Sequence, residues 1–465
     1  MGAARWRHSW HCMRVLIITQ IYRPEMGALA NRMHPIARKL AASGHAVSVA
    51  TGMPNYPEGV VFPGYRNRLF MKEKLPECTV FRTSYFTVPR NHSQWRQLFS
   101  YLSFVVAAFI SALRAGPVDV VFVTSPPIFP VIAGILIARL RKAKLVFDLR
   151  DLWPDEIVAC GAQTEDALSI RLIKRIERWG YKEAACVTCT TNAFIDTVVK
   201  RGVKPEKAVL IPNGADLQLF HPMPGENLAK QAGSAKPFVV LYSGLLGIKH
   251  GIEVILEAAE LLKDHSDIKF VFIGNGARSA SLRQLQTEKN LHNVEFLGEK
   301  PLNEVPQVIA NSDICVTSLL AETYLEKIIP VKIFEYMACA KPVVASIAGE
   351  GAAILTLSGA GMVTAPGDAR ALADAILKLR SDPQLCADMS ARGLDYVTRN
   401  YSREVAAERL EGVFRRLVSG DEPNAGYNEK PHAVVLQSGE AVTGGSELSP
   451  AVDEANEDAP LCAKK

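Results

Sequence analysis

The sequence of 465 residues lacks the features that mark several common functional classes. Its formal net charge of +5 is small, and no basic segment carries interleaved aromatic residues, so nucleic-acid binding is not indicated. The nine cysteines show no framework spacing, which excludes a small disulfide-stapled scaffold and suits a reducing compartment. No Gly-x-Gly-x-x-Gly fingerprint occurs, so a nicotinamide cofactor is not indicated. The first twelve residues lack the apolar run of a signal peptide.

Short β-branched runs alternate with helical patterns along most of the chain, which is typical of parallel sheets with crossover helices. The strands predicted in the first half are 14–19, 45–50, 118–124, 144–148, 186–189 and 208–212. The pattern then restarts, with strands predicted at 238–242, 269–273, 294–297, 313–316, 342–346 and 362–364. The sequence therefore predicts an α/β protein with two doubly wound, Rossmann-like domains facing each other across a cleft.

The amino-acid composition indicates where the domains, the linker and the tail begin and end. Residues 222–237 are rich in Pro, Gly and Ala, as in a linker, and the chain after 418 is acidic with a single aromatic residue. We predict a disordered extension (1–12), a first domain (13–221), a linker (222–237), a second domain (238–400), a terminal helix that could cross back to the first domain (401–418) and a disordered acidic tail (419–465).

One stretch is unusually apolar. Leu98–Leu113 holds no charged residue, and Arg96 and Arg114 flank it. It is short for a membrane-spanning helix, which needs about 20 residues. Two alternatives remain open: a core helix packed on the first sheet, or a helix that lies in a membrane interface with Phe104 and Phe109 on its apolar face.

In the first half, glycine, polar and aromatic residues follow three predicted strands, where they would face the cleft. The clustered charges Arg150 and Asp151 directly follow a buried strand, and such charges are costly unless they pair or face a cavity. They could pair with each other, and the other loops could be plain surface turns. As contacts for a second substrate we predict Gly27, Asn31, Asn55, Tyr56 and Trp153.

In the second half, two glycine turns end strands and precede helices. Such turns let a phosphate approach the backbone, while helix-start amides and basic side chains supply positive charge. As contacts for a nucleotide diphosphate we predict Gly244, Gly247, Lys249, His250, Gly274, Asn275 and Gly276.

A short helix predicted to begin near Pro330 places Lys332 and Glu335 on one face. A carboxylate can accept both hydroxyls of a ribose, and a lysine can neutralise a phosphate. The alternative is a surface ion pair between the two.

This last segment, Glu335-Tyr-Met-Ala-Cys-Ala-Lys-Pro-Val-Val-Ala, resembles the EAMA-x-G-x-PVVA signature of the family 4 retaining glycosyltransferases, which have the GT-B fold. Ile211-Pro-Asn-Gly-Ala-Asp resembles the IPNGVD joint between their domains. Phe147-Asp-Leu-Arg-Asp-Leu-Trp-Pro and Pro54-Asn-Tyr-Pro-Glu-Gly are closer to a subgroup, the WbuB-type enzymes of surface-polysaccharide assembly. The resemblance spans about residues 13–418.

The resemblance implies roles and two departures. Glu335 matches the second glutamate of the family's E-x7-E pair, which holds the donor ribose. Lys327 stands where the first glutamate would be, and Glu350 could help to hold the donor instead. Leu245 replaces the arginine of the family's first nucleotide loop. The diphosphate must then be neutralised by Lys332, Lys249 or His250.

Arg150 and Asp151 match the position of the family's His-Asp motif in the cleft, and with Lys332 and Glu335 they are the catalytic candidates. The resemblance implies retaining transfer of a sugar from a nucleotide-diphosphate sugar, preferably a UDP-sugar, to a glycan or polyprenyl-linked acceptor. It also implies a cytoplasmic enzyme, at the inner face of the membrane if the apolar helix binds lipid. We expect no cofactor and no metal, because the sequence has no Asp-x-Asp motif. The alternatives are a nucleotide-sugar 2-epimerase of similar fold and a catalytically degenerate nucleotide-sugar-binding protein.

Overall fold

The computed structural model describes residues 12–25, 27–56, 58–66, 68–89, 94–159, 164–225 and 237–424. The predicted N-terminal extension, apart from Cys12, and the acidic tail from residue 425 lie outside these ranges, as does most of the predicted linker at 222–237.

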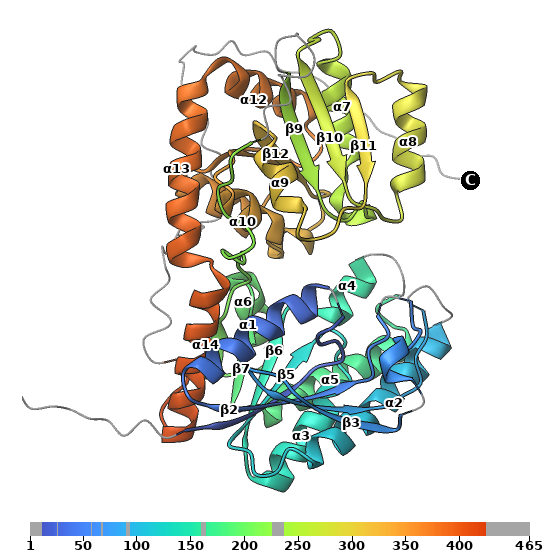
Figure 1. The fold of residues 1–465 in the computed structure, drawn as a ribbon, viewed down its shortest axis with the longest axis vertical. Coiled ribbons are helices and arrows are strands. Elements are labelled where there is room, and N and C mark those ends of the chain that lie inside the picture. The colour runs from blue at the N-terminus through green and yellow to red at the C-terminus, as the bar shows by residue number, and fades with distance from the viewer. Residues whose placement is uncertain are drawn as a thin grey trace, which may run out of the picture. The chain divides into compact units, whose positions relative to one another are not determined.

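The first half is built on an eight-stranded sheet in the order β3-β4-β2-β1-β5-β6-β7-β8 (Figure 1). All neighbours pair in parallel except β3 and β4. The strands are β1 (Arg14–Ile18), β2 (Ala46–Gly52), β3 (Phe70–Lys74), β4 (Thr79–Thr83), β5 (Val120–Ser125), β6 (Lys144–Leu149), β7 (Cys186–Cys189) and β8 (Ala208–Leu210). The central strands are apolar on both faces because helices cover both sides of a parallel sheet.

Helices pack on the two faces of this sheet in separate cores. On one side lie α2 (Gln94–Leu113), α3 (Pro130–Arg141) and α5 (Leu168–Glu183). On the other lie α1 (Ala28–Ala42) and the last described helix, α14 (Arg403–Ser419). The short helices α4 (Trp153–Ala159) and α6 (Asn192–Lys200) follow β6 and β7 at the carboxyl ends of the strands.

The sequence analysis missed the β3–β4 hairpin at the edge of the first sheet. The β3 residues Phe-Met-Lys-Glu-Lys alternate between exposed and half-buried positions. Lys and Glu are depleted in strands generally, but charged side chains protect an edge strand from pairing with other chains. The pattern that obscured the strand in the sequence therefore follows from its edge position.

The second half is a six-stranded, all-parallel sheet in the order β11-β10-β9-β12-β13-β14. Its strands are β9 (Phe238–Ser243), β10 (Ile268–Ile273), β11 (Val294–Gly298), β12 (Ile314–Ser318), β13 (Val343–Ser346) and β14 (Gly361–Thr364). Its helices are α7 (Glu253–Leu261), α8 (Ser279–Glu288), α9 (Val305–Ala310), α10 (Val331–Ala338), α11 (Glu350–Ser358), α12 (Ala369–Ser381) and α13 (Pro383–Asn400). The predicted two-domain α/β architecture is confirmed.

The chain passes between the two halves along two segments that lie side by side. Ala215 forms a parallel bridge with Ser402. The Arg403 guanidinium lies 3.1 Å from the Asp216 carboxylate. Beyond this point α14 packs on the first sheet, where the Phe414 ring contacts that of Phe122. The last helix is thus part of the core of the first half.

Helix α2 packs one face in the core and leaves several apolar side chains exposed. Trp95–Leu113 is apolar and long enough to cross a membrane by length and composition alone, a weak criterion that core helices also meet. One face is core: Phe104 is fully buried and its ring packs on Tyr85. Trp95 and Phe99, by contrast, are 82% and 58% exposed. The placement of Phe104 on an exposed apolar face was wrong, because that side chain faces the sheet.

Candidate functional site

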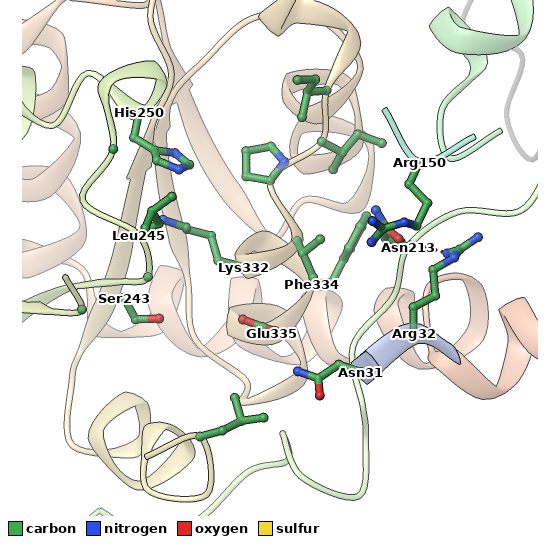
Figure 2. A pocket seen from close by; sticks show the side chains of 18 of the residues that line it. Asn31, Arg32, Arg150, Asn213, Ser243, Leu245, His250, Lys332, Phe334 and Glu335 are labelled. Carbon is green, nitrogen blue, oxygen red and sulfur yellow. Dashed lines mark hydrogen bonds between the residues drawn. The ribbon is translucent and has the colours of Figure 1, made fainter. Parts of the chain in front are cut away.

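A cavity of about 1350 Å³ lies where the carboxyl-end loops of both sheets meet (Figure 2). This volume exceeds the few hundred to 1,000 Å³ of a typical small-ligand site, and it leaves room for two substrates. Most of the predicted donor and catalytic residues line it. Those that do are Arg150, Asp151, Gly244, Gly247, Lys249, His250, Gly274, Asn275, Gly276, Lys332 and Glu335.

Four of the five residues predicted on the acceptor side are not among those that line this cavity. Asn55 is buried, and its amide donates to the Met53 carbonyl and the Tyr85 hydroxyl. The Tyr56 ring lies directly against Gly27, so closely that a Cβ at Gly27 would be 3.2 Å from it. These residues hold the loops in place; among the five acceptor-side predictions, Asn31 is the one on the cavity wall.

Trp153, which was also predicted to contact the second substrate, is not among the residues that line the cavity. The indole ring packs edge-on against the rings of Tyr101 and Phe129, at centroid distances of 5.7 and 5.8 Å. These rings belong to α2 and to the turn before α3. Trp153 therefore anchors the start of α4 in the first core, because stacking on two aromatic neighbours buries more apolar area than a polar cavity offers.

Glu350, the predicted substitute for the family's first glutamate, is not among the cavity-lining residues. Its carboxylate accepts hydrogen bonds from the backbone N–H of Asn192 at 3.1 Å and of Ala193 at 3.2 Å. These amides form the first turn of α6, where a negative charge is stabilised by the helix dipole. Glu350 thus joins the second half to the first. Lys327, at the position of the family's glutamate, does not line the cavity either.

The two glycine turns of the second half pack against each other. The Leu246 N–H donates to the Asn275 carbonyl at 3.0 Å, and a Cβ at Gly274 would lie only 1.9 Å from the Gly244 oxygen. Gly274 also has φ +128°, a backbone conformation that side chains rarely adopt. Glycine is therefore required there for the fit between the turns, and the pair forms one continuous floor of the cavity.

Lys332 enters this floor from α10, as Figure 2 shows. It is 8% exposed, and its amine nitrogen lies 3.7 Å from the centroid of the Tyr242 ring. A Cβ at Gly244 would be 3.1 Å from that nitrogen, so the glycine leaves room for the lysine. Within the described residues, the amine has no hydrogen-bond partner. Burial lowers the pKa of Lys332 to about 7, although Glu335 opposes the shift.

The other two basic candidates in this half differ from Lys332. The Lys249 amine already lies 3.1 Å from the Glu156 carboxylate of the first half. Burial, with the neighbouring Lys332 and Lys249, lowers the pKa of His250 to about 3. His250 is therefore a neutral hydrogen-bonding group near neutral pH, and its Nδ1 has no partner in the described part of the chain.

Glu335 lies in the centre of the view in Figure 2, one turn of α10 after Lys332. Burial raises its pKa, while Arg403 and Lys332 oppose that shift. No ion pair closer than 4.0 Å joins Glu335 to Lys332 among the described residues, so the surface-pair alternative does not hold. Both groups face the cavity and can meet a ligand.

On the opposite wall, burial lowers the pKa of Arg150. Its Nε atom is buried and lacks a hydrogen-bond partner within the described ranges. Burial, and then the nearby Glu156, raises the pKa of Asp151 to about 6. A cation and a titratable carboxylate thus face the donor loops across the cavity.

Sequence reasoning overlooked a buried ion pair beneath this wall. The Arg32 guanidinium, 3.1 Å from the Asp148 carboxylate, also donates to the carbonyls of Ile211 and Pro212 and to the Asn213 side chain. Arg32 thereby ties α1 and β6 to the joint between the halves. The signal in the sequence that could have indicated a buried role for Arg32 was its position in the first turns of α1, on the side that faces the sheet.

A second overlooked residue is Glu25, which is fully buried. Its carboxylate accepts the backbone N–H groups of Asn55 and Tyr56, both at 2.9 Å, and of Tyr22 at 3.2 Å. Burial raises its pKa, and these hydrogen bonds oppose the shift. One side chain therefore fixes the loops that follow β1 and β2 relative to each other.

We expect Glu25→Gln to loosen both loops, since the amide group of glutamine would face at least one backbone donor. An unsatisfied buried N–H costs about 1–3 kcal/mol. Hydrogen exchange at Asn55 and Tyr56 should accelerate, and the thermal midpoint should fall. The matched control is Glu58→Gln, an exposed position in the same loop. Equal exchange rates in the wild type and the Glu25 variant would contradict this role.

Two largely parallel sheets whose carboxyl-end loops share one cavity, with packed glycine turns and a buried lysine on its floor, have the architecture of the GT-B fold. Two family models match the chain: the glycosyl transferase 4-like domain over residues 27–214 and the glycosyl transferases group 1 over residues 225–395. Together they cover most of the chain. It belongs to the family 4 glycosyltransferases, as the sequence motifs predicted.

Relatives and solved structures agree with this assignment. The chain is 25% identical over 309 residues to the colanic acid biosynthesis glycosyl transferase WcaI of Escherichia coli (strain K12), covering 65% of this chain and 75% of WcaI. It is 27% identical over 350 residues to the glycosyltransferase WbjE of Pseudomonas aeruginosa, covering 72% and 84%. In fold it is similar to sucrose-phosphate synthase from Thermosynechococcus elongatus (TM-score 0.69, 20% identity, 88% and 100% covered). It is also similar to Anabaena HepE in complex with UDP (TM-score 0.64, 20% identity, 88% and 100% covered).

Proposed function

We propose that this glycosyltransferase moves a sugar, with retention of anomeric configuration and without a metal ion, from a UDP-sugar bound by its second half. The acceptor is a glycan or polyprenyl-linked glycan of surface-polysaccharide biosynthesis, bound by the first half. The names of WcaI and the UDP complex of HepE support the pathway class and the base. The sequence motifs support retention.

The observation that carries the proposal is the Lys332 amine. A buried amine without a hydrogen-bond partner is costly, and proteins keep one where a ligand completes it. Here it lies at the glycine turns, which is where a diphosphate would approach the backbone. Lys332 then supplies, from α10, the charge that Leu245 in the first glycine turn cannot supply.

On this proposal, Lys332 and the neutral His250 stabilise the charge that develops on the diphosphate as the glycosidic bond breaks. The Glu335 carboxylate accepts hydrogen bonds from the ribose hydroxyls. Arg150 and Asp151 face the reacting sugar from the acceptor wall. The acceptor hydroxyl loses its proton to the departing diphosphate oxygen on the same face of the sugar, which retains the configuration without an enzyme nucleophile.

The test is a thermal-shift panel of UDP, GDP, ADP, dTDP and their common sugar conjugates, with and without magnesium. A ligand that binds the folded state raises its stability with the logarithm of concentration over Kd. We expect a shift with UDP ligands that magnesium does not change and that Lys332→Met removes. Transfer to acceptor lipids extracted from cell membranes then separates an enzyme from a degenerate binding protein. No shift with any nucleotide would reject the donor site.

We further propose that α2 holds the enzyme at a membrane surface, where a polyprenyl-linked acceptor resides. Trp95, Phe99, Leu102 and Val106 recur at helical spacing on the side of α2 that the sheet does not cover. Arg96 and Arg114 flank the apolar stretch along the chain, and each basic residue near an anionic surface contributes about 1 kcal/mol. The buried residues of α2 argue for lying on the membrane and against crossing it, since crossing would remove them from the core.

Replacing Phe99 and Val106 together by glutamate should lower binding to phosphatidylglycerol-containing vesicles by about tenfold to a hundredfold. The reason is the loss of apolar burial: little more than half of each side chain is exposed and available to a membrane, so the two together lose about 2–3 kcal/mol. Vesicle flotation measures the effect. The control is Leu261→Glu, an exposed apolar position on α7 of the second half. A folded double variant that still floats like the wild type would reject the interface.

A further inference from the structure

The surroundings of Lys332 have a consequence for how a donor binds. The amine is buried, has no hydrogen-bond partner among the described residues, and lies at the cavity floor. An ammonium group removed from water loses its hydration, and nothing here replaces it with hydrogen bonds. Such a site favours the uncharged amine unless nearby charges compensate.

The groups that face Lys332 do not fully replace the hydration that its ammonium form loses on burial. On η4, the short helix Ile248–His250, Lys249 carries the same charge and His250 is neutral. On β9, the face of the Tyr242 ring attracts a cation, but it replaces only part of a hydration shell. On α10 itself, Glu335 attracts the ammonium group without a hydrogen bond to it. Burial is the largest influence, and it acts against the charge.

We propose that, at mildly alkaline pH, Lys332 is mostly an uncharged amine in the empty site and that it takes up one proton when the diphosphate of a nucleotide sugar enters. The two negative charges of the diphosphate supply the partner that the empty site lacks, so they favour the ammonium form. The inference rests on the proposed donor site. It adds that the site binds its donor together with a proton.

The sign of the pH dependence follows by linkage. The pKa of free Lys332, about 7, is lower than the pKa in the complex, where the diphosphate favours the charged form. Binding is therefore strongest below about pH 7, where Lys332 is already charged. Above that pH, Lys332 must take up a proton from the solvent each time a donor binds. The Kd of the donor therefore rises by up to about tenfold per pH unit until the pKa of Lys332 in the complex is passed.

The first experiment needs no ligand. An unfolded lysine titrates near pH 10.4, so between about pH 7 and 10 the unfolded chain binds the extra proton. The unfolding constant of the wild type, divided by that of Lys332→Met, should fall by roughly tenfold for each pH unit across this range. Lys263→Met, at an exposed position on the second half, is the matched control and should give a flat ratio. A flat ratio for Lys332→Met would overturn the proposal.

The second experiment is calorimetric titration with UDP-glucose at about pH 8 in buffers of different ionisation enthalpy. A nucleotide sugar has no terminal phosphate, whose second ionisation lies near pH 6, so the ligand itself takes up no proton. We expect an uptake approaching one proton in the wild type and in His250→Gln, and none in Lys332→Arg, because arginine is always charged. Binding without uptake in the wild type, or uptake that persists in Lys332→Arg, overturns the proposal. A third outcome separates the two proposals. If the stability ratio depends on pH as expected but UDP-glucose does not bind, the proposed donor site is rejected, while the uncharged state of Lys332 is supported.

Discussion

Glu335→Ala is expected to raise the dissociation constant of the donor nucleotide by about a hundredfold to ten-thousandfold. A carboxylate that accepts hydrogen bonds from two ribose hydroxyls makes two charge-assisted hydrogen bonds, each worth about 1.5–3 kcal/mol. Their loss totals about 3–6 kcal/mol, and each 1.4 kcal/mol is about tenfold in affinity. Titration calorimetry with the nucleotide that the thermal-shift panel selects measures the change.

The controls for this prediction separate binding from folding. Glu257→Gln, at an exposed position of α7, should leave both the affinity and the thermal midpoint unchanged. Glu335→Ala itself should fold normally, since no ion pair with another described residue depends on that carboxylate. Wild-type affinity in this variant would remove Glu335 from the donor site.

Asp148→Ala is expected to destabilise the first half by about 3–5 kcal/mol, the cost of leaving a buried charge without its partner. Asp148 is fully buried and accepts hydrogen bonds from Arg32 at 3.1 Å, Thr124 at 3.0 Å and Thr188 at 2.8 Å. Its removal leaves the Arg32 guanidinium in the core with only neutral acceptors. Urea unfolding, followed by the fluorescence of the tryptophans, measures the loss.

A double variant shows whether the effect belongs to the pair. Adding Arg32→Met to Asp148→Ala removes the uncompensated charge, so part of the lost stability should return. Asp395→Ala breaks an exposed pair with Arg399 one helical turn away and should have little effect. If Asp148→Ala unfolds at the same urea concentration as the Asp395 variant, the network contributes no stability.

The donor side of the cavity could be predicted well from sequence because its residues act close to where the chain places them. A glycine turn after a strand lies at the carboxyl end of the sheet wherever the sheet packs, and all seven predicted turn residues line the cavity. The helix that carries Lys332 and Glu335 begins beside its predicted start, Pro330. Local pattern and position along the strand were sufficient for these residues.

The acceptor side was predicted less well because its residues act through partners that are distant in sequence. Asn55 is held by Tyr85, and Tyr56 by Glu25, across about thirty residues. Trp153 packs on α2, which no spacing in the sequence relates to it. A polar or aromatic residue in a loop faces the cavity or the core according to these contacts, and a sequence pattern does not contain them.

The sequence by itself determined the two-sheet architecture, the loops that carry the donor site and the family, since hydrophobic periodicity and glycine turns are local properties. The tertiary structure alone decided which basic group lies without a hydrogen bond at the proposed diphosphate position. Lys249 is paired with Glu156, His250 is neutral, and Lys332 lies buried without a hydrogen bond among the described residues. The physical reason is that the state of a charge depends on the water and the partners around it, and folding sets both.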